Sequence, residues 1–197
     1  MTVYRYALEQ LYADQDFEWV VDTIPAVVAW VPGDSRPKRS QPFRFPLRHT
    51  VGQYTSTHQL ELTWDIGQLR AQDPTVSQRA KRLRTGKTVQ REHLAELAAY
   101  GLTLVAISVL MPRRRVVAMN NGVAPDFLFD VTPNRLSGVE AAGRSRGGWG
   151  ALNAVGNGTP KKRGKRKQLL ARTDIAEVSL SLWCASPRAS VMEQVKP

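Results

Sequence analysis

The sequence predicts an α/β protein in which a mixed central sheet is flanked by helices. The chain has 197 residues, enough for one domain with a substantial apolar core. In its second half, helical and strand-like apolar patterns follow one another in the order helix, three strands, helix, strand, helix. This order is typical of an α/β sandwich built around a mixed sheet.

A long helix opens the second half, after a basic linking segment at 78–87. Thr85 or Thr88 can cap its start. Seven residues form its apolar face: Val89, Leu94, Leu97, Ala98, Leu102, Val105 and Ala106. On the same helix Glu92 and Glu96 are four residues apart and share a face.

Strands are expected at 115–119, 127–131, 137–142 and 175–184, where apolar residues cluster or alternate. The pair Pro133-Asn134 predicts a hairpin between the second and third strands. The glycine-rich stretch after Gly143 is expected to be a loop. A helix is expected at 161–172, and a short terminal helix from Pro187 to about Val195.

The first 80 residues are expected either to form an appended lobe or to add strands to the sheet of the main domain, residues 81–197. Residues 4–22 have partly helical apolar spacing, whereas 24–31 and 59–66 are typical of strands. Residues 35–48 are basic, aromatic and rich in proline, which predicts an extended loop. Phe43 and Phe45 there either stack on nucleic-acid bases or pack on the core.

The charge balance favours an acidic partner. The chain has 28 Lys and Arg against 17 Asp and Glu, a net charge of +11. Such a field favours nucleic acid, although an acidic protein partner or a need for solubility would also account for it.

A cytoplasmic protein without membrane contact is expected. No signal-peptide pattern is visible at the N-terminus, and the apolar run at 102–111 is too short to span a bilayer. The single cysteine, Cys184, excludes an internal disulfide and sits in a strand pattern typical of a buried thiol.

Two acids on neighbouring predicted strands form the candidate site. Asp126 opens the strand at 127–131, and Glu140 lies in the strand at 137–142. Two carboxylates brought together this way can hold Mg²⁺, which takes oxygen ligands and usually only one or two carboxylates. Asp130 is an alternative to Asp126. The structural alternative is that both acids pair with arginines such as Arg115 and Arg144.

Pro125-Asp126 followed by Glu140-x-Ala142 resembles the core motif of the PD-(D/E)xK nuclease superfamily. The lysine usual two residues after the second acid is absent, and Ala142 stands there. The run from Glu140 through a loop to 165–169 is similar to small bacterial branches in which the following helix carries the lysine. The resemblance covers roughly residues 92–187.

This resemblance implies a restriction-endonuclease-like core with an N-terminal extension. It implies Asp126 and Glu140 as Mg²⁺ ligands and catalytic acids, Lys165 as the displaced lysine, and Glu96 as an acid on the preceding helix. An ordinary exposed glutamate is the alternative reading of Glu96.

The segment from Arg144 to Arg172 holds nine Lys and Arg and no acid. A solvated face would have the same composition, but glycines and an aromatic side chain in the segment favour an ordered nucleic-acid surface. The candidate contacts are Arg144, Arg146, Lys161, Lys162, Arg163, Arg166, Lys167 and Gln168.

Two functions follow as hypotheses. The first is a Mg²⁺-dependent nuclease or nuclease-fold subunit acting on DNA in a bacterial defence or DNA-processing system. The second is a catalytically inactive nucleic-acid-binding or assembly subunit of a larger protein complex.

Overall fold

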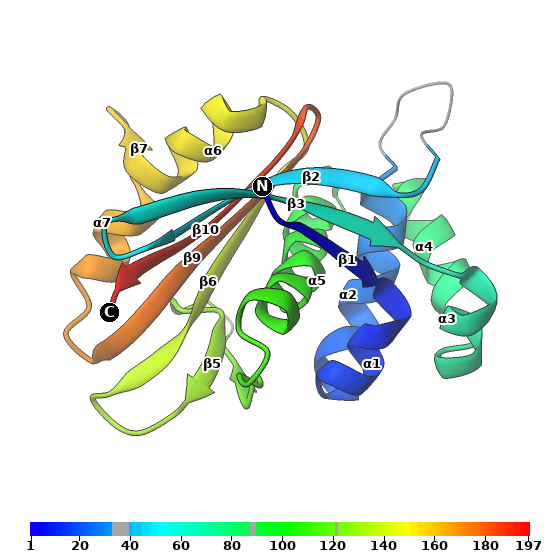
Figure 1. Ribbon diagram of the computed structural model, residues 1–197, viewed down its shortest axis with the longest axis horizontal. Coiled ribbons are helices and arrows are strands. Elements are labelled where there is room, and N and C mark those ends of the chain that lie inside the picture. Colours follow the sequence, from blue (N-terminus) through cyan, green and yellow to red (C-terminus); the bar gives the residue numbers. More distant parts are fainter. Residues whose placement is uncertain (33–39, 87–89, 121) are drawn as a thin grey trace.

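The computed structural model describes residues 1–32, 40–86, 90–120 and 122–197 (Figure 1). One mixed sheet of eight strands runs through the domain in the order β1-β3-β2-β10-β9-β6-β5-β4, with helices on both faces, so the expected fold class is confirmed. The strands are β1 (Val3–Ala7), β2 (Phe43–Val51), β3 (Tyr54–Thr63), β4 (Ala118–Met119), β5 (Phe127–Asp130), β6 (Leu136–Arg144), β9 (Ile175–Ala185) and β10 (Arg188–Lys196).

The helices come from three parts of the chain, 8–30, 66–110 and 148–170. They are η1 (Leu8–Gln10), α1 (Leu11–Asp14), α2 (Phe17–Trp30), α3 (Ile66–Gln72), α4 (Val76–Arg84), α5 (Arg91–Leu110), α6 (Gly148–Asn157) and α7 (Lys165–Leu170). A separate two-stranded hairpin, β7 (Gly158–Thr159) with β8 (Lys162–Arg163), connects α6 to α7.

The second half of the chain follows the expected order. Helix α5 is followed by the antiparallel strands β4, β5 and β6, and after α6 and α7 the chain returns as β9, parallel to β6. A parallel return needs a crossover, which here carries both helices and the hairpin. The long helix begins later than expected, at Arg91, after residues 87–89, which lie outside the described residues.

The strands of the first 80 residues belong to the same sheet. Strand β2 pairs in parallel with β10, β3 pairs with β2, and β1 lies at the outer edge. Of the expected loop at 35–48, residues 43–48 instead lie in β2, and 33–39 lie outside the described residues. Phe43 and Phe45 are buried in the core, so they are not available to stack on bases.

Two assignments at the ends of the chain were wrong. Residues 24–31, expected as a strand, lie in and just after α2. All of them are buried against α5, α4 and the sheet, and a helix buried on every side has the same β-branched composition as a buried strand. Residues 188–196, expected as a helix, form β10, which pairs with β9 on one side and β2 on the other.

Two basic segments also differ from expectation. The segment at 78–87 is helical as far as Arg84, in α4, rather than a linker. The glycine-rich stretch is not a loop, because residues 148–157 form α6 and pack on β9 and β10. The helix expected at 161–172 is reduced to α7, since Lys162 and Arg163 lie in β8.

Apolar side chains cover both faces of the sheet. The larger cluster joins α2 and α5 to one face, and the smaller joins α6 and α7 to the other (Figure 1). Helix α5 approaches β6 so closely that a Cβ on Gly143 would overlap the carbonyl oxygen of Ala95. Glycine at this position allows the backbone of α5 to pack directly against β6, the strand that carries Glu140.

Helix α5 has the length and composition that would allow it to cross a membrane, a stretch longer than the apolar run considered from sequence. More than half of it is buried inside the domain, and it packs between α2 and β6. Its apolar character is therefore accounted for by its place as the core helix of an α/β domain.

Candidate active site

The site begins where β5 and β6 separate. Phe127 is the first residue of β5 and lies opposite Val139, so Asp126 comes next to Glu140. The Asp126 side chain here takes the place of a backbone acceptor between the two strands: its Oδ2 accepts a hydrogen bond of 2.8 Å from the Ala141 N–H. This contact anchors Asp126 to the strand that carries Glu140.

Glu140 points to the face of the sheet covered by α6 and α7. Its strand neighbours Val139 and Ala141 pack toward α5, whereas Ala142 belongs to the cluster beneath α6 and α7. The Glu140 side chain is only 4% exposed. Its Oε1 accepts a hydrogen bond from Lys165 Nζ in an ion pair, and its buried Oε2 has no hydrogen-bond partner among the described residues.

Lys165 is the first residue of α7, and the backbone before it fixes its position. Gly164 lies directly against the backbone of Gly156 and Asn157 at the end of α6, where a Cβ would overlap main-chain atoms. Helix α7 therefore starts close to α6 and packs on β9 and β10, and the Lys165 side chain reaches Glu140 in β6. The lysine supplied by the helix thus lies at the acid of the strand, as the resemblance implied.

Helix α5 contributes Tyr100, which the sequence reading missed. Its hydroxyl donates to Asp126 Oδ1 at 3.1 Å, and its ring packs edge-on against Phe127. Burial raises the pKa of Tyr100 above its usual range, and the nearby charges of Asp126, Glu96 and Glu140 act in the same direction. The signal was available, since Tyr100 lies four residues after Glu96 and shares its face.

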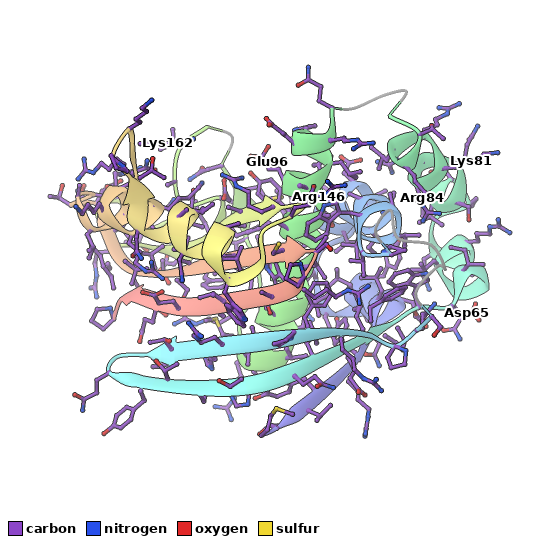
Figure 2. All side chains as sticks on the ribbon, turned by 90° about the horizontal axis from the view of Figure 1, so that it is seen from above. Asp65, Lys81, Arg84, Glu96, Arg146 and Lys162 are labelled. Carbon is purple, nitrogen blue, oxygen red and sulfur yellow. The ribbon has the colours of Figure 1, made fainter. Side chains whose placement is uncertain are left out.

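Glu96 lies at the outer margin of this group. Its side chain is about half exposed and is 3.3 Å from His93 Nδ1. Figure 2 shows it on α5 at the face seen from above. Its charge is near enough to act on Tyr100, but it does not contact Asp126 or Glu140 through any hydrogen bond among the described residues.

The environment of Asp126 shifts the pKa of its carboxyl group. Burial raises the pKa of Asp126 to about 6, and the negative charge of Glu140 adds to the rise. The Ala141 N–H, Lys165 and the Tyr100 hydroxyl act in the opposite direction. Asp126 is thus a carboxyl group that changes charge close to neutral pH.

This shift gives the stability of the metal-free protein a defined pH dependence. The pKa of Asp126 is about 6 in the folded protein against 3.8 ordinarily, so the folded state holds the proton more tightly than the unfolded chain. Stability therefore falls as pH rises from about 4 to 6. In EDTA, the free energy of unfolding of Asp126→Asn is expected to decline less over this range than that of wild type.

Asp130→Asn is the matched control for this measurement. Thr132 donates hydrogen bonds to Asp130 from its hydroxyl and its N–H and so lowers the pKa of that carboxyl. Asp130 therefore contributes stability that is lost as pH falls below about 4. Parallel pH curves for wild type and Asp126→Asn would contradict the shift.

The donor set fits a hard cation. Among the described residues no three His, Cys, Asp or Glu side chains gather as a metal cluster, so a metal here would take two carboxylates. Mg²⁺ is usually held by one or two carboxylates together with waters and substrate phosphates. Glu140 Oε2 is buried and has no hydrogen-bond partner in the part of the chain that the structure describes, so it is an acceptor that a cation would satisfy.

The alternatives considered from sequence are not found in the described structure. Asp130 caps the turn after β5, opposite Ser137 rather than Glu140. Arg144 donates to the carbonyl of Gly143, and neither it nor Arg115 forms an ion pair with Asp126 or Glu140 among the described residues.

The basic candidates differ in exposure and in their contacts, and two of the exposed ones, Arg144 and Arg163, donate to the backbone carbonyl groups of Gly143 and Lys167. Arg144, Arg146, Lys161, Lys162, Arg163 and Lys167 are exposed. Arg166 forms a two-point ion pair with Glu193 and donates to Asn157, and Gln168 donates to the carbonyl of Arg163. These last two side chains therefore serve the structure of the crossover.

Comparison of the chain with protein-family models, with curated proteins and with solved structures finds no match. The assignment of function therefore depends on the geometry of this site.

Proposed function

We propose that this protein is a metal-dependent nuclease that cleaves phosphodiester bonds in nucleic acid, with Asp126 and Glu140 as ligands of Mg²⁺. The observation that carries the proposal is the ion pair between Lys165 and the buried Glu140, beside Asp126, a second and partly buried carboxylate. Three ionisable groups converge there: Glu140 from β6, Asp126 from the residue just before β5, and Lys165 from α7. They do so although burying charge is energetically costly. Such convergence is typical of sites that need shifted pKa values.

Each side chain has a distinct role in the proposed chemistry. Bound Mg²⁺ would supply an activated water and stabilise charge on the phosphate. Tyr100 and the Ala141 N–H hold both oxygens of Asp126 in place. The Lys165 ammonium, on leaving Glu140, can donate to a phosphate oxygen as negative charge develops on it.

The order of elements supports a relation to the PD-(D/E)xK superfamily. A helix precedes three antiparallel strands, the first acid precedes the second of these strands, and the second acid lies within the third. Strand β9 then returns parallel to β6. The departure is Ala142, which packs in the apolar cluster, while the lysine comes from α7. We extend the proposal to DNA as substrate, in a bacterial defence or DNA-processing system in the cytoplasm.

The exposed basic residues around α7 are the proposed nucleic-acid surface. Figure 2 shows Lys162 projecting from the hairpin toward the upper margin of the view, and Glu96 also lies in the upper part of that view. Lys161, Lys162, Arg163 and Lys167 lie within six residues of Lys165 and are exposed. A phosphate backbone crossing them would pass over the carboxylate pair.

Replacing these four residues together with glutamine is expected to flatten the salt dependence of DNA binding. Each neutralised phosphate contributes about −0.9 to the slope of log affinity against log salt for duplex DNA, so the slope should change by up to about 3–4. Binding is measured in EDTA at several salt concentrations. A quadruple variant at Arg5, Arg70, Arg113 and Arg135 has the same change in charge, and an equal effect from it would place the surface elsewhere.

The second candidate is a subunit that binds nucleic acid, or assembles with other proteins, without cleaving. The observation that favours it is the same ion pair, because Lys165 neutralises Glu140 and leaves that side chain 4% exposed. A site used only for structure would stay closed in this way.

One experiment separates the two candidates. Pure protein is incubated with end-labelled single- and double-stranded DNA and RNA, in Mg²⁺, Mn²⁺ or EDTA. The nuclease proposal expects cleavage with either metal, none in EDTA, and loss of cleavage in Glu140→Gln. If the protein binds nucleic acid but cleaves none of the substrates with either Mg²⁺ or Mn²⁺, the second candidate is supported instead.

A further inference from the structure

A second concave site lies at the far end of β6, away from the carboxylate pair. It has a volume of about 430 Å³, within the range of small-molecule sites. Its walls come from the ends of α2 and α4, the start of α5, the turn after β6 and the turn between β9 and β10. The lining includes four arginines, Arg84, Arg91, Arg146 and Arg188, and an apolar wall that includes Trp30, Leu83 and Leu94.

Two of these arginines are fixed by the fold. Arg84 Nη2 donates to the carbonyl of Val28 at 2.8 Å, and Arg188 Nη2 donates to that of Val31 at 3.0 Å. Both carbonyls lie at the end of α2, whose last carbonyl groups attract cations. The guanidinium of Arg188 also lies over the rings of Phe43 and Phe45.

The other two arginines are free to meet a ligand. Arg91 and Arg146 are exposed, and neither has a hydrogen bond or ion pair with another group in the part of the chain that the structure describes. Arg91 is the first residue of α5, a helix of 20 residues whose N-terminus adds a partial positive charge. Figure 2 shows Arg146 near the middle of the domain and Arg84 on α4, and both line the pocket.

No acid lines this site among the described residues. Four guanidinium groups in one concavity repel each other, and an anion with several oxygens would offset that repulsion by charge-assisted hydrogen bonds. A phosphate monoester carries close to two negative charges at pH 7, more than the single charge of a backbone phosphodiester.

We infer that this arginine pocket binds a phosphate monoester, of the kind found at the end of a nucleic-acid strand or on a free nucleotide. The pocket is a cavity with an apolar wall, so it suits a terminal group with its base rather than a strand passing over the surface. The choice of nucleic acid as source rests on the proposed function, whereas the phosphate chemistry rests on the pocket alone.

The distance to the carboxylate pair fits a strand end. Four residues of β6 separate Glu140 from Arg144, about 13 Å at the usual strand rise, and nine residues of α5 separate Arg91 from Tyr100, also about 13 Å. This length corresponds to roughly four base steps of a duplex strand. A terminal phosphate held in the pocket would place a bond a few nucleotides inward at Lys165.

The test measures binding in EDTA, so it does not depend on cleavage. Short DNA strands carrying a 5′-phosphate, a 3′-phosphate or only hydroxyl ends are titrated with wild-type protein. At least one phosphorylated end is expected to bind about tenfold or more tightly than the hydroxyl strand, as hydrogen bonds to charged groups allow. Arg91→Gln/Arg146→Gln is expected to abolish this preference, and Arg113→Gln/Arg135→Gln, with the same charge change, to retain it.

Competition with mononucleotide identifies the source of the phosphate. If a nucleoside monophosphate displaces the phosphorylated strand at similar concentration, the pocket is a nucleotide site; if only the strand competes, it is a strand-end site. Equal binding of phosphorylated and hydroxyl strands by wild type, or an undiminished preference in the pocket variant, would overturn the inference. The preference is expected to survive in Lys165→Ala, so failure of the nuclease proposal is seen separately.

Discussion

Lys165→Ala is expected to lose the proposed nuclease activity by about 10²–10³-fold, because one well-placed donor to developing charge contributes about 3–4 kcal/mol to the transition state. Lys165 Nζ lies at Glu140, and among the described residues it is the only basic group that forms an ion pair with that acid. DNA affinity should change little, since several other exposed basic residues remain around α7. The measurements are cleavage rate in Mg²⁺ and binding affinity in EDTA.

The control is Lys167→Ala, two residues along the same helix, whose side chain is exposed. It is expected to leave the cleavage rate within a few-fold of wild type. Loss of the ion pair also leaves Glu140 buried without its partner, which lowers stability. Unfolding of both variants is therefore measured, and cleavage is assayed well below their transition temperatures. Activity surviving in Lys165→Ala, or equal small effects of the two substitutions, would remove Lys165 from the mechanism.

The second large effect concerns stability. Trp183→Ala is expected to lower the free energy of unfolding by about 3–5 kcal/mol, as is usual for a fully buried tryptophan. Trp183 in β9 is completely buried, and its ring packs edge-on against Phe45 of β2 at 5.5 Å. Its Nε1 donates to Ser181 Oγ at 2.8 Å and Thr103 Oγ1 at 3.2 Å. The side chain therefore joins α5, the central sheet and the N-terminal strands.

This substitution also tests whether the two halves fold together. Because Trp183 contacts both, wild type is expected to unfold in one transition, and the variant in one transition at lower denaturant concentration. Trp64→Ala is the control, since Trp64 is half-buried and stacks on Phe43 at the edge. A loss below 1 kcal/mol in Trp183→Ala, or separate transitions for the two halves, would contradict this account.

Local patterns in the sequence predicted two elements of the second half, although both are largely buried. The alternation at 175–184 predicted β9, and the apolar face starting near Leu94 predicted α5. The pattern misled at 24–31 of α2, where every residue is buried, because an enclosed helical segment and a buried strand cannot be told apart by periodicity alone. It also misled at β10, whose strand state depends on the open edges of β9 and β2, two segments far away in the sequence.

By itself, the sequence determined the α/β class and the strong positive charge, and it predicted Asp126 and Glu140 as the acids of the candidate site. These follow from residue type and short-range spacing, whereas Lys165 was implied only by the resemblance to the nuclease superfamily. Only the tertiary structure decided that Tyr100 holds Asp126, that Arg166 is bound by Glu193, and that four arginines from separate elements share one pocket. Each of these contacts joins residues from different elements, and their meeting is set by how helices pack on the sheet, a property that no local pattern carries.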